Sequence, residues 1–457
     1  MTETDQFGLW AFFRPTTIHT AGWRFPGANP RANFDLGELT RAALKLEHAC
    51  FDALFMADHL ALLNMPMDGL KRSHTATSFE PLTLLSALSS LTRRIGLVAT
   101  GSTTYDEPFH IARRFASLDH LSAGRAGWNI VTTANPDTAH NFAFDDHLDH
   151  DARYERAGEF VRVVKGLWDS WSDDAFVHDA ASGICFEPAG LHVLDHQGKH
   201  FRVRGPLNIA RPPQGWPVLV QAGASSAGMQ LAAESADVVF TAQTTLAGAQ
   251  VFYEDLKQRV ARAGRSTEFC KIFVGTLVVV GKTADEAREK RRLMDQLVHY
   301  ESGMASLSVA LGHNISAYDP DGPLPDLPVT NEGVSSQRRV LEIATRENLT
   351  TIRQLAGRVG GYFGNEIVGT PVQVADEMER WFRQKACDGF IVMFPYLPEG
   401  VDHFVELVVP ILQQRGLFRR QYAGSTLREH LGLPRPPNQF VDADQPTYEG
   451  HVRPLRG

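Results

Sequence analysis

The chain has 457 residues, of which 43% are hydrophobic and 21% are charged, and this composition excludes a disordered, collagen-like or coiled-coil protein. Lys and Arg number 45 against 53 Asp and Glu, and a net charge of −8 without any basic block disfavours a nucleic-acid partner. The acidic N-terminus does not fit a signal peptide and no apolar run approaches the roughly 20 residues of a membrane span, so we expect a cytoplasmic protein with no membrane partner.

Eight short apolar runs recur along the chain. Each is almost continuously hydrophobic, which is typical of parallel strands that are covered on both faces. In chain order, the predicted strands are 7–13, 51–58, 94–102, 126–133, 217–223, 238–243, 271–281 and 389–395. Segments with helical periodicity lie between them, at 35–50, 78–92, 108–121, 151–170, 226–236, 246–264 and 371–386. This alternation predicts an α/β protein, and eight strands favour a closed (β/α)₈ TIM barrel over a doubly wound open sheet.

Three long insertions interrupt the alternation. They cover 134–150 after the fourth strand, 172–216 before the fifth and 301–370 after the seventh. Loops of this length in a compact domain usually form functional lids or small subdomains. We therefore expect a catalytic barrel over 1–416 with these insertions, followed by a tail, 417–457, that wraps the barrel or an oligomer partner.

Several common catalytic motifs are absent or incomplete. No G-x-G-x-x-G follows a strand, and the segment GASSAG (223–228) lacks the glycine that a serine hydrolase needs two residues after its nucleophile. His192, His196 and His200 are spaced as metal ligands on one helix face would be, but the surrounding alternation and Gly198 favour a hairpin. We expect no metal site.

Polar residues cluster where the predicted strands end, which is where a barrel carries its chemistry. They include Asp58 after the second strand and Asn129 in the fourth. Ser225 and Ser226 end the fifth strand and precede an alanine-rich helix, so hydroxyls and free backbone N–H groups would converge there. This pattern fits a phosphate site, and it also fits a plain N-cap serine.

A second polar pair lies at the start of the predicted helix 151–170, which follows the first long insertion. His150 and Tyr154 are one turn apart, so they share a face of the helix that begins near residue 151. The pair could clamp a ligand, or it could be a surface or packing pair.

With these residues collected, the chain resembles the flavin-dependent monooxygenases of the bacterial luciferase superfamily. The resemblance is closest to the group that acts on nitrilotriacetate, EDTA, dimethyl sulfide and dibenzothiophene sulfone. It is carried by FDALFMAD, ARRFASLDHLSAGRAGWNIVTT, HDARYERAGEFVRVVKGLWDSW, HQGKHFRVRGPLNIARPPQGWPVLVQAGASSAG, DGFIVMFPYLPEGVDHFVELVVPILQQRG and LREHLGL, which together span nearly the whole chain.

The resemblance implies a TIM barrel that takes reduced FMN from a separate NAD(P)H:flavin reductase. It implies that the flavin reacts with O₂ to give a peroxide or hydroperoxide that oxygenates a small organic substrate. The substrate classes it suggests are aminopolycarboxylates, organosulfur compounds and N-heterocycles or flavins, often with cleavage of a C–N or C–S bond. The flavin contacts that it implies are Asp58, Thr104, Asn129, His150, Tyr154, Ser225 and Ser226.

Residues near the end of the first strand complete the expected site. His19 is the candidate for proton transfer or for orienting the peroxide, because its ordinary pKa suits chemistry near neutral pH. The apolar residues Trp10, Phe12 and Phe13 are expected walls of the substrate pocket, and Arg24 could pair with an anionic substrate.

One element departs from the pattern of some relatives. They carry a histidine after the seventh strand where this chain has Ala310, and here His313 stands displaced within that segment. The departure leaves open which residue protonates the peroxide, and it could mark a different substrate class.

The sequence leaves three alternative functions open. They are a deazaflavin-dependent oxidoreductase of the same superfamily, a flavin-binding protein without turnover, and a metal-dependent hydrolase. A homodimer or homotetramer is the expected assembly.

Overall fold

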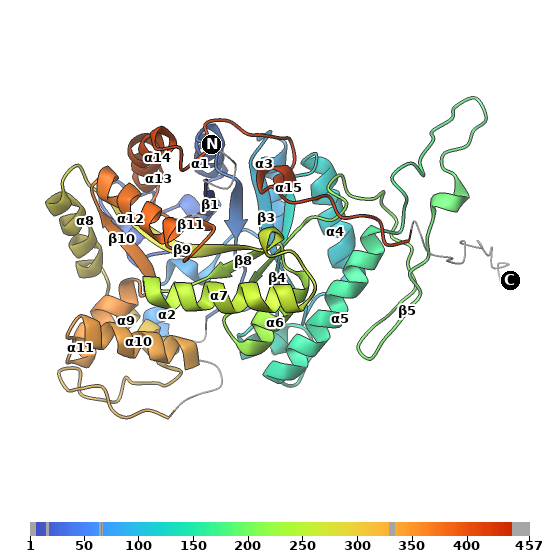
Figure 1. Ribbon diagram of the computed structural model, residues 1–457. Helices are drawn as coiled ribbons and strands as arrows, with labels where there is room; N and C mark the ends of the chain where they lie inside the picture. The colour runs from blue at the N-terminus through green and yellow to red at the C-terminus, as the bar shows by residue number, and fades with distance from the viewer. Residues whose placement is uncertain (1–5, 15–17, 64, 66, 329–333, 441–457) are drawn as a thin grey trace.

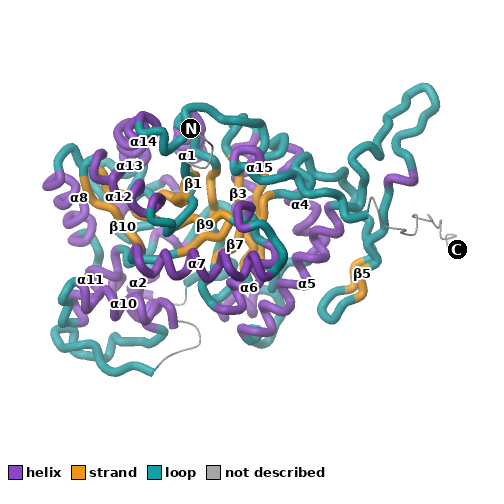
Figure 2. Tube along the Cα trace, in the orientation of Figure 1, coloured by secondary structure: helices purple, strands orange, loops and turns teal. Residues whose placement is uncertain are grey.

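The computed structural model describes residues 6–14, 18–63, 65, 67–328 and 334–440. Eight parallel strands at the centre are ringed by helices, which confirms the predicted TIM barrel (Figures 1 and 2). The strands are β1 (Gly8–Phe12), β2 (Ala53–Met56), β3 (Gly96–Ser102), β4 (Ala126–Val131), β7 (Val218–Ala222), β8 (Val238–Thr241), β9 (Lys271–Val280) and β11 (Gly389–Met393). The ring closes where β1 pairs with β11, from Gly8 opposite Gly389 to Ala11 opposite Val392.

All seven predicted helices are present, and the structure adds others. The expected ones are α1 (Leu36–His48), α3 (Pro81–Ser89), α4 (Pro108–Leu121), α5 (His150–Trp168), α6 (Ser226–Ser235), α7 (Leu246–Arg262) and α12 (Pro371–Arg383). The additional ones are α2 (Met67–Leu70), α8 (Ala284–Gln296), α9 (Tyr300–Leu311), α10 (Val334–Arg346), α11 (Ile352–Gly361), α13 (Glu399–His403), α14 (Val409–Gln414) and α15 (Leu427–His430). None of the helices in the described ranges is long and apolar enough to cross a membrane.

The insertion after β9 forms a small helical subdomain and a ninth strand. Helices α9, α10 and α11 pack around their own apolar cluster at the carboxyl end of the barrel strands (Figure 1). The extra strand, β10 (Asn365–Gly369), pairs with Thr276–Val280 of β9. The first residues of β9, Lys271–Val274, pair with β8, so β10 continues the same edge of β9 where β8 has ended.

The insertion before β7 leaves the barrel as an extended arm, residues 172–206 (Figure 1). As predicted, it contains a hairpin, with β5 (His196–Gln197) antiparallel to β6 (Arg202–Val203). Glu159 of α5 holds this hairpin by accepting hydrogen bonds from the His196 ring and from the backbone N–H groups of His200 and Phe201.

Packing inside the barrel follows strand alternation. Trp10, Phe55 and Phe273 fill the interior, while alternate residues such as Leu9 and Ala11 face the helices. Leu427, Leu431 and Leu433 of the tail join the interior cluster. Because α15 also lies against Gly96 and Gly127 at the start of β3 and β4, the tail closes the amino-terminal end of the barrel.

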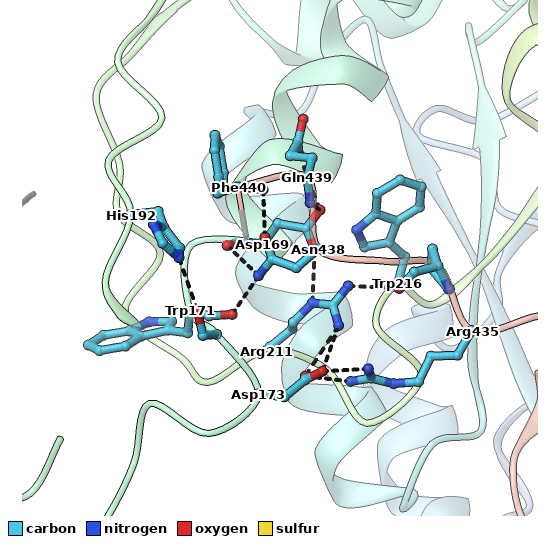
Figure 3. A network of polar contacts seen from close by, with 12 residues as sticks. Asp169, Trp171, Asp173, His192, Arg211, Trp216, Arg435, Asn438, Gln439 and Phe440 are labelled. Atoms are coloured by element: carbon cyan, nitrogen blue, oxygen red, sulfur yellow. Dashed lines mark hydrogen bonds and ion pairs between the residues drawn. The ribbon is translucent and has the colours of Figure 1, made fainter. Parts of the chain in front are cut away.

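The described part of the tail, 417–440, is held by hydrogen bonds and ion pairs at two positions. Arg428 donates to Asp237 at 2.8 Å beneath β8. Further on, Arg435 and Arg211 share the carboxylate of Asp173, and Asn438 donates to the Asp169 and Trp171 carbonyls, joining the tail to the base of the arm (Figure 3). The remainder of the predicted tail, 441–457, lies outside the described residues.

Candidate active site

A cavity of about 1560 Å³ opens at the carboxyl end of the barrel. Its walls come from the ends of β2, β3, β4 and β7 and from α3, α4 and α9. The residues at those strand ends include Asp58, Thr100, Ser102, Val131 and Ala222, and α9 with the turn after it adds Ala305, Ser308, Val309 and His313. The chemistry-bearing strand ends predicted from sequence therefore surround one cavity.

One corner of this cavity is built for close approach to an anion. Ser225 caps α6 by accepting a hydrogen bond from the N–H of Gly228 at 3.1 Å. The N–H groups of Ser226 and Ala227, in the first turn of α6, find no backbone acceptor among the described residues. Because a helix N-terminus with free donors attracts negative charge, this corner can hold a phosphate.

Tyr154 reaches the same corner from α5 and lines the cavity. A Cβ atom at Gly228 would lie 3.1 Å from both the Tyr154 hydroxyl and the Ser225 hydroxyl, so only glycine leaves these groups in place. The His150 ring lies against that of Tyr154 in a tilted arrangement, with centroids 4.8 Å apart. The structure therefore brings His150, Tyr154 and Ser225 together, as the sequence predicted, whereas the exposed Ser226 hydroxyl lies 3.5 Å from Arg259.

Asn129 offers an unused acceptor beneath the cavity. Its side chain is 2% exposed, and its Nδ2 donates to the Thr100 hydroxyl at 2.8 Å. Its Oδ1 is buried without a hydrogen-bond partner among the described residues. Since a buried polar atom is normally satisfied, this oxygen marks a position where a bound donor is missing.

Thr104 and Asp58 differ in whether they line the cavity. Thr104 is buried, and its hydroxyl donates to the Thr132 carbonyl, so it supports the loop rather than lining the cavity. Asp58 lines the cavity, and its pKa is raised by burial and by the nearby carboxylates of Glu80 and Asp106.

His19 lies deeper than the sequence suggested. It is 1% exposed, its Nδ1 accepts from the N–H of Ala21, and its Nε2 lies 3.5 Å from Asp295 and 3.4 Å from Arg291. Burial lowers the pKa of its ring. It is not among the residues that line the cavity, so its proposed part in proton transfer stays a prediction.

The predicted substrate-pocket residues separate. Phe12 points into the barrel, where its ring lies 5.5 Å from that of Phe55 beneath the cavity. Trp10 is fully buried one layer below. Phe13 packs in the outer layer between strands and helices, and the exposed Arg24 donates to the Leu297 carbonyl, so neither fits the predicted place in the pocket.

The histidines singled out for metal binding do not converge. His192 bonds to Ser172 and His196 to Glu159, while His200 lies 3.5 Å from Glu155. Within the described residues, no group of three or more His, Cys, Asp or Glu side chains is placed to hold a metal ion. By contrast, His313 lines the cavity, and Ala310 is buried in the subdomain.

Sequence reasoning missed one residue of this end of the barrel. Arg14 lies two residues beyond the end of β1 and is half-buried near the cavity residue His59. Its position one residue beyond a predicted strand was the available signal.

Taken together, these residues fit FMN. The corner formed by Ser225, Tyr154 and His150 suits the phosphate, and the unpartnered Oδ1 of Asn129 suits a flavin N–H. Tyr154 at the corner and Thr100, the partner of Asn129, line one cavity large enough for a flavin and a substrate.

Comparison with known proteins agrees with the fold. The profile of the family described as luciferase-like monooxygenase matches residues 6–388. N-acetyl-S-(2-succino)cysteine monooxygenase of Bacillus subtilis (strain 168) is 48% identical over 96% of this chain and 99% of its own. Nitrilotriacetate monooxygenase component A of Aminobacter aminovorans is 46% identical, with the same coverage.

A solved structure supports the same assignment. Riboflavin lyase, with modified FMN and its substrate riboflavin, superposes with a TM-score of 0.83 at 31% identity, covering 93% of this chain and 96% of its own. The chain therefore belongs to the luciferase-like monooxygenase family.

Proposed function

We propose that the protein is the oxygenating component of a two-component monooxygenase that uses reduced FMN and O₂ on a small organic substrate. The observation that carries the proposal is the anion-binding corner of Ser225, Tyr154 and the α6 N-terminus at the edge of the cavity, together with the unpartnered Oδ1 of Asn129 next to the cavity residue Thr100. Family membership supports it, and so does the FMN named in the structure of riboflavin lyase.

Each group of residues has a defined task in this proposal. Ser225, Tyr154 and His150 hold the phosphate, and the Asn129 amide oxygen accepts a hydrogen bond from the ring system. Once bound, reduced FMN supplies the electrons with which one oxygen atom of O₂ enters the substrate and the other leaves as water. The protein's part is to orient the partners and to keep water away from them.

Apolar groups around the cavity supply the dry environment. Inside the barrel, Phe12, Phe55 and Phe240 form an aromatic layer, with ring centroids 5.5 and 5.9 Å apart along the series. Ala305 and Val309 of α9 form part of the opposite wall. The α9–α11 subdomain thus acts as the cover of the site, and His313 is the imidazole that borders the cavity from this side.

A separate NAD(P)H:flavin reductase is proposed to deliver the reduced flavin. The name of the nitrilotriacetate relative, component A, points to a system of more than one protein. No G-x-G-x-x-G segment in this sequence offers a nicotinamide site of its own.

Anaerobic titration of the protein with reduced FMN and reduced riboflavin tests the proposal. Because the α6 corner is expected to contribute charge-assisted hydrogen bonds to the phosphate, FMN should bind at least about tenfold more tightly. Equal affinity for the two flavins, or no binding of either, would contradict it.

A further inference from the structure

Arg14 occupies a distinctive place at the carboxyl end of the barrel. The N–H of Phe13 still pairs with the Phe55 carbonyl of β2, and Arg14 then turns out of the ladder by donating its N–H to the Phe12 carbonyl at 3.0 Å. The residue is therefore fixed beside the ends of β1 and β2, where the cavity residues Asp58 and His59 follow β2.

The guanidinium of Arg14 has no counter-charge. Among the described residues it makes neither a hydrogen bond nor an ion pair through its side chain, although the side chain is half-buried. Burial is the sole influence on it, and lowers its pKa to about 10. An arginine has five donors, and none of those of Arg14 is used within the described residues.

Arg291, at the same end of the barrel, shows what a structural arginine looks like here. Its guanidinium bonds to Glu366 at 2.8 Å and to Asp295. Burial alone would lower its pKa, but these two carboxylates outweigh burial and raise it. Arg14 and Arg291 thus differ in whether the guanidinium has hydrogen-bond acceptors around it.

The charges near Arg14 leave room for an anion. Its positive charge adds to burial in lowering the pKa of His59, which borders the cavity, and that of His74. The cavity carboxylates form a separate group, because Asp58 is influenced by Glu80 and Asp106. The β1 side of the site therefore carries a cation that is unpaired within the described chain, whereas on the β3 side Asp106 is paired with Arg114 of α4.

We propose that Arg14 binds a carboxylate of the substrate, and that the substrate is consequently a small carboxylic acid. This inference rests on the proposed monooxygenase function and narrows its substrate class. The planar guanidinium matches a carboxylate with two parallel hydrogen bonds, which explains why the site retains a cation that the folded protein alone does not satisfy. Arg24, the cation expected from sequence for this task, is already bonded to the Leu297 carbonyl.

Calorimetric titration of the full-length protein with tricarballylate, a tricarboxylate probe, tests the binding step. The wild type should bind tricarballylate and not its uncharged triamide, and Arg14→Gln should weaken tricarballylate binding by roughly tenfold or more. Arg14→Lys should retain part of the affinity because it keeps the charge. Arg31→Gln, at an exposed arginine, is the matched control and should bind as the wild type does. Unchanged tricarballylate affinity in Arg14→Gln would overturn the proposal.

Thermal stability separates a binding role from a structural one. Because the Arg14 guanidinium lacks a partner, Arg14→Met should raise Tm. Arg291→Met should lower Tm because it strands Glu366 and Asp295. A fall in Tm for Arg14→Met would show that the residue holds the fold together and would contradict the proposal.

Failure of this inference can be told apart from failure of the proposed function. Titration with reduced FMN is run on the same variants, and Arg14→Gln should bind FMN as the wild type does. A wild type that binds FMN but does not prefer tricarballylate to its triamide, or an Arg14→Gln variant that keeps this preference, would overturn the inference alone. Absence of FMN binding in the wild type would overturn the proposed function.

Discussion

The Tyr154 hydroxyl lies 3.1 Å from the point where a Cβ on Gly228 would stand. Gly228 also donates its N–H to the capping hydroxyl of Ser225. This contact joins the N-terminal part of α5 to the start of α6 and forms the corner assigned to the FMN phosphate.

Replacing Gly228 with alanine should close this corner. The added methyl group displaces Tyr154 or Ser225, so the affinity for reduced FMN should fall by about tenfold, as expected for the loss of one charged hydrogen bond. Anaerobic fluorescence titration measures this affinity. Gly357→Ala, in α11 with open space around the position, is the control and should leave affinity unchanged. Equal affinity in both variants would refute the proposed phosphate corner.

Ser225→Ala separates a ligand contact from a helix cap. Loss of the cap should cost about 1 kcal/mol of unfolding free energy, and reduced FMN should also bind more weakly. Thr245 caps α7 in the same way by accepting from Gly248, and it does not line the cavity. Thr245→Ala should therefore lose similar stability without losing FMN affinity. If the two variants bind FMN equally well, Ser225 is only a cap.

The stability of the arm should depend on the ionised carboxylate of Glu159. Burial alone would raise the pKa of Glu159, but hydrogen bonds from His196 and from the N–H groups of His200 and Phe201 bring it to about 2. A carboxyl with a depressed folded pKa stabilises the protein above its unfolded value of about 4.5, and this contribution is lost as pH falls from there towards 2.

Glu159→Gln should consequently lower Tm at neutral pH and flatten the loss of Tm between about pH 5 and pH 3. Differential scanning calorimetry across that range measures both effects. Glu155→Gln, at an exposed carboxylate bonded to Lys199, is the control and should follow the wild type closely. If the Tm of Glu159→Gln falls with pH as steeply as that of the wild type, Glu159 is not the carboxylate on which the stability of the arm depends.

The tail should unfold together with the barrel. Arg428 and Asp237 form a buried pair, so Arg428→Met strands the carboxylate and should cost about 3 kcal/mol or more in urea unfolding. Arg420→Met, on the exposed part of the same tail, should cost less than about 1 kcal/mol. Similar small losses in both variants would show that the tail contributes little to the barrel's stability.

Much of the fold could be predicted because local pattern and tertiary environment agree. The eight barrel strands are continuously apolar since each is covered on both faces. Strand β10 was missed because it alternates buried and half-buried residues and includes Asn365 and Glu366. Helix α8 was missed because its surface is highly charged, with only Ala287, Arg291 and Met294 buried.

Features of the candidate site also differ in whether they depend on local sequence or on distant residues. Ser225 and Tyr154 could be found because turn chemistry and helix spacing are local properties. The isolation of Arg14 and the burial of His19 depend on which distant residues pack against them, such as Asp295 against His19 and none of the described carboxylates against Arg14. Sequence spacing carries no information about such partners.

The most direct test of the central claim is stopped-flow reoxidation of reduced FMN, followed by flavin absorbance. Protein and photoreduced FMN are mixed anaerobically and then exposed to oxygenated buffer, with or without small carboxylic acids. The monooxygenase account predicts reoxidation kinetics that differ from those of free FMN and change when a substrate is present. Reoxidation at the rate of free FMN under all conditions would contradict it.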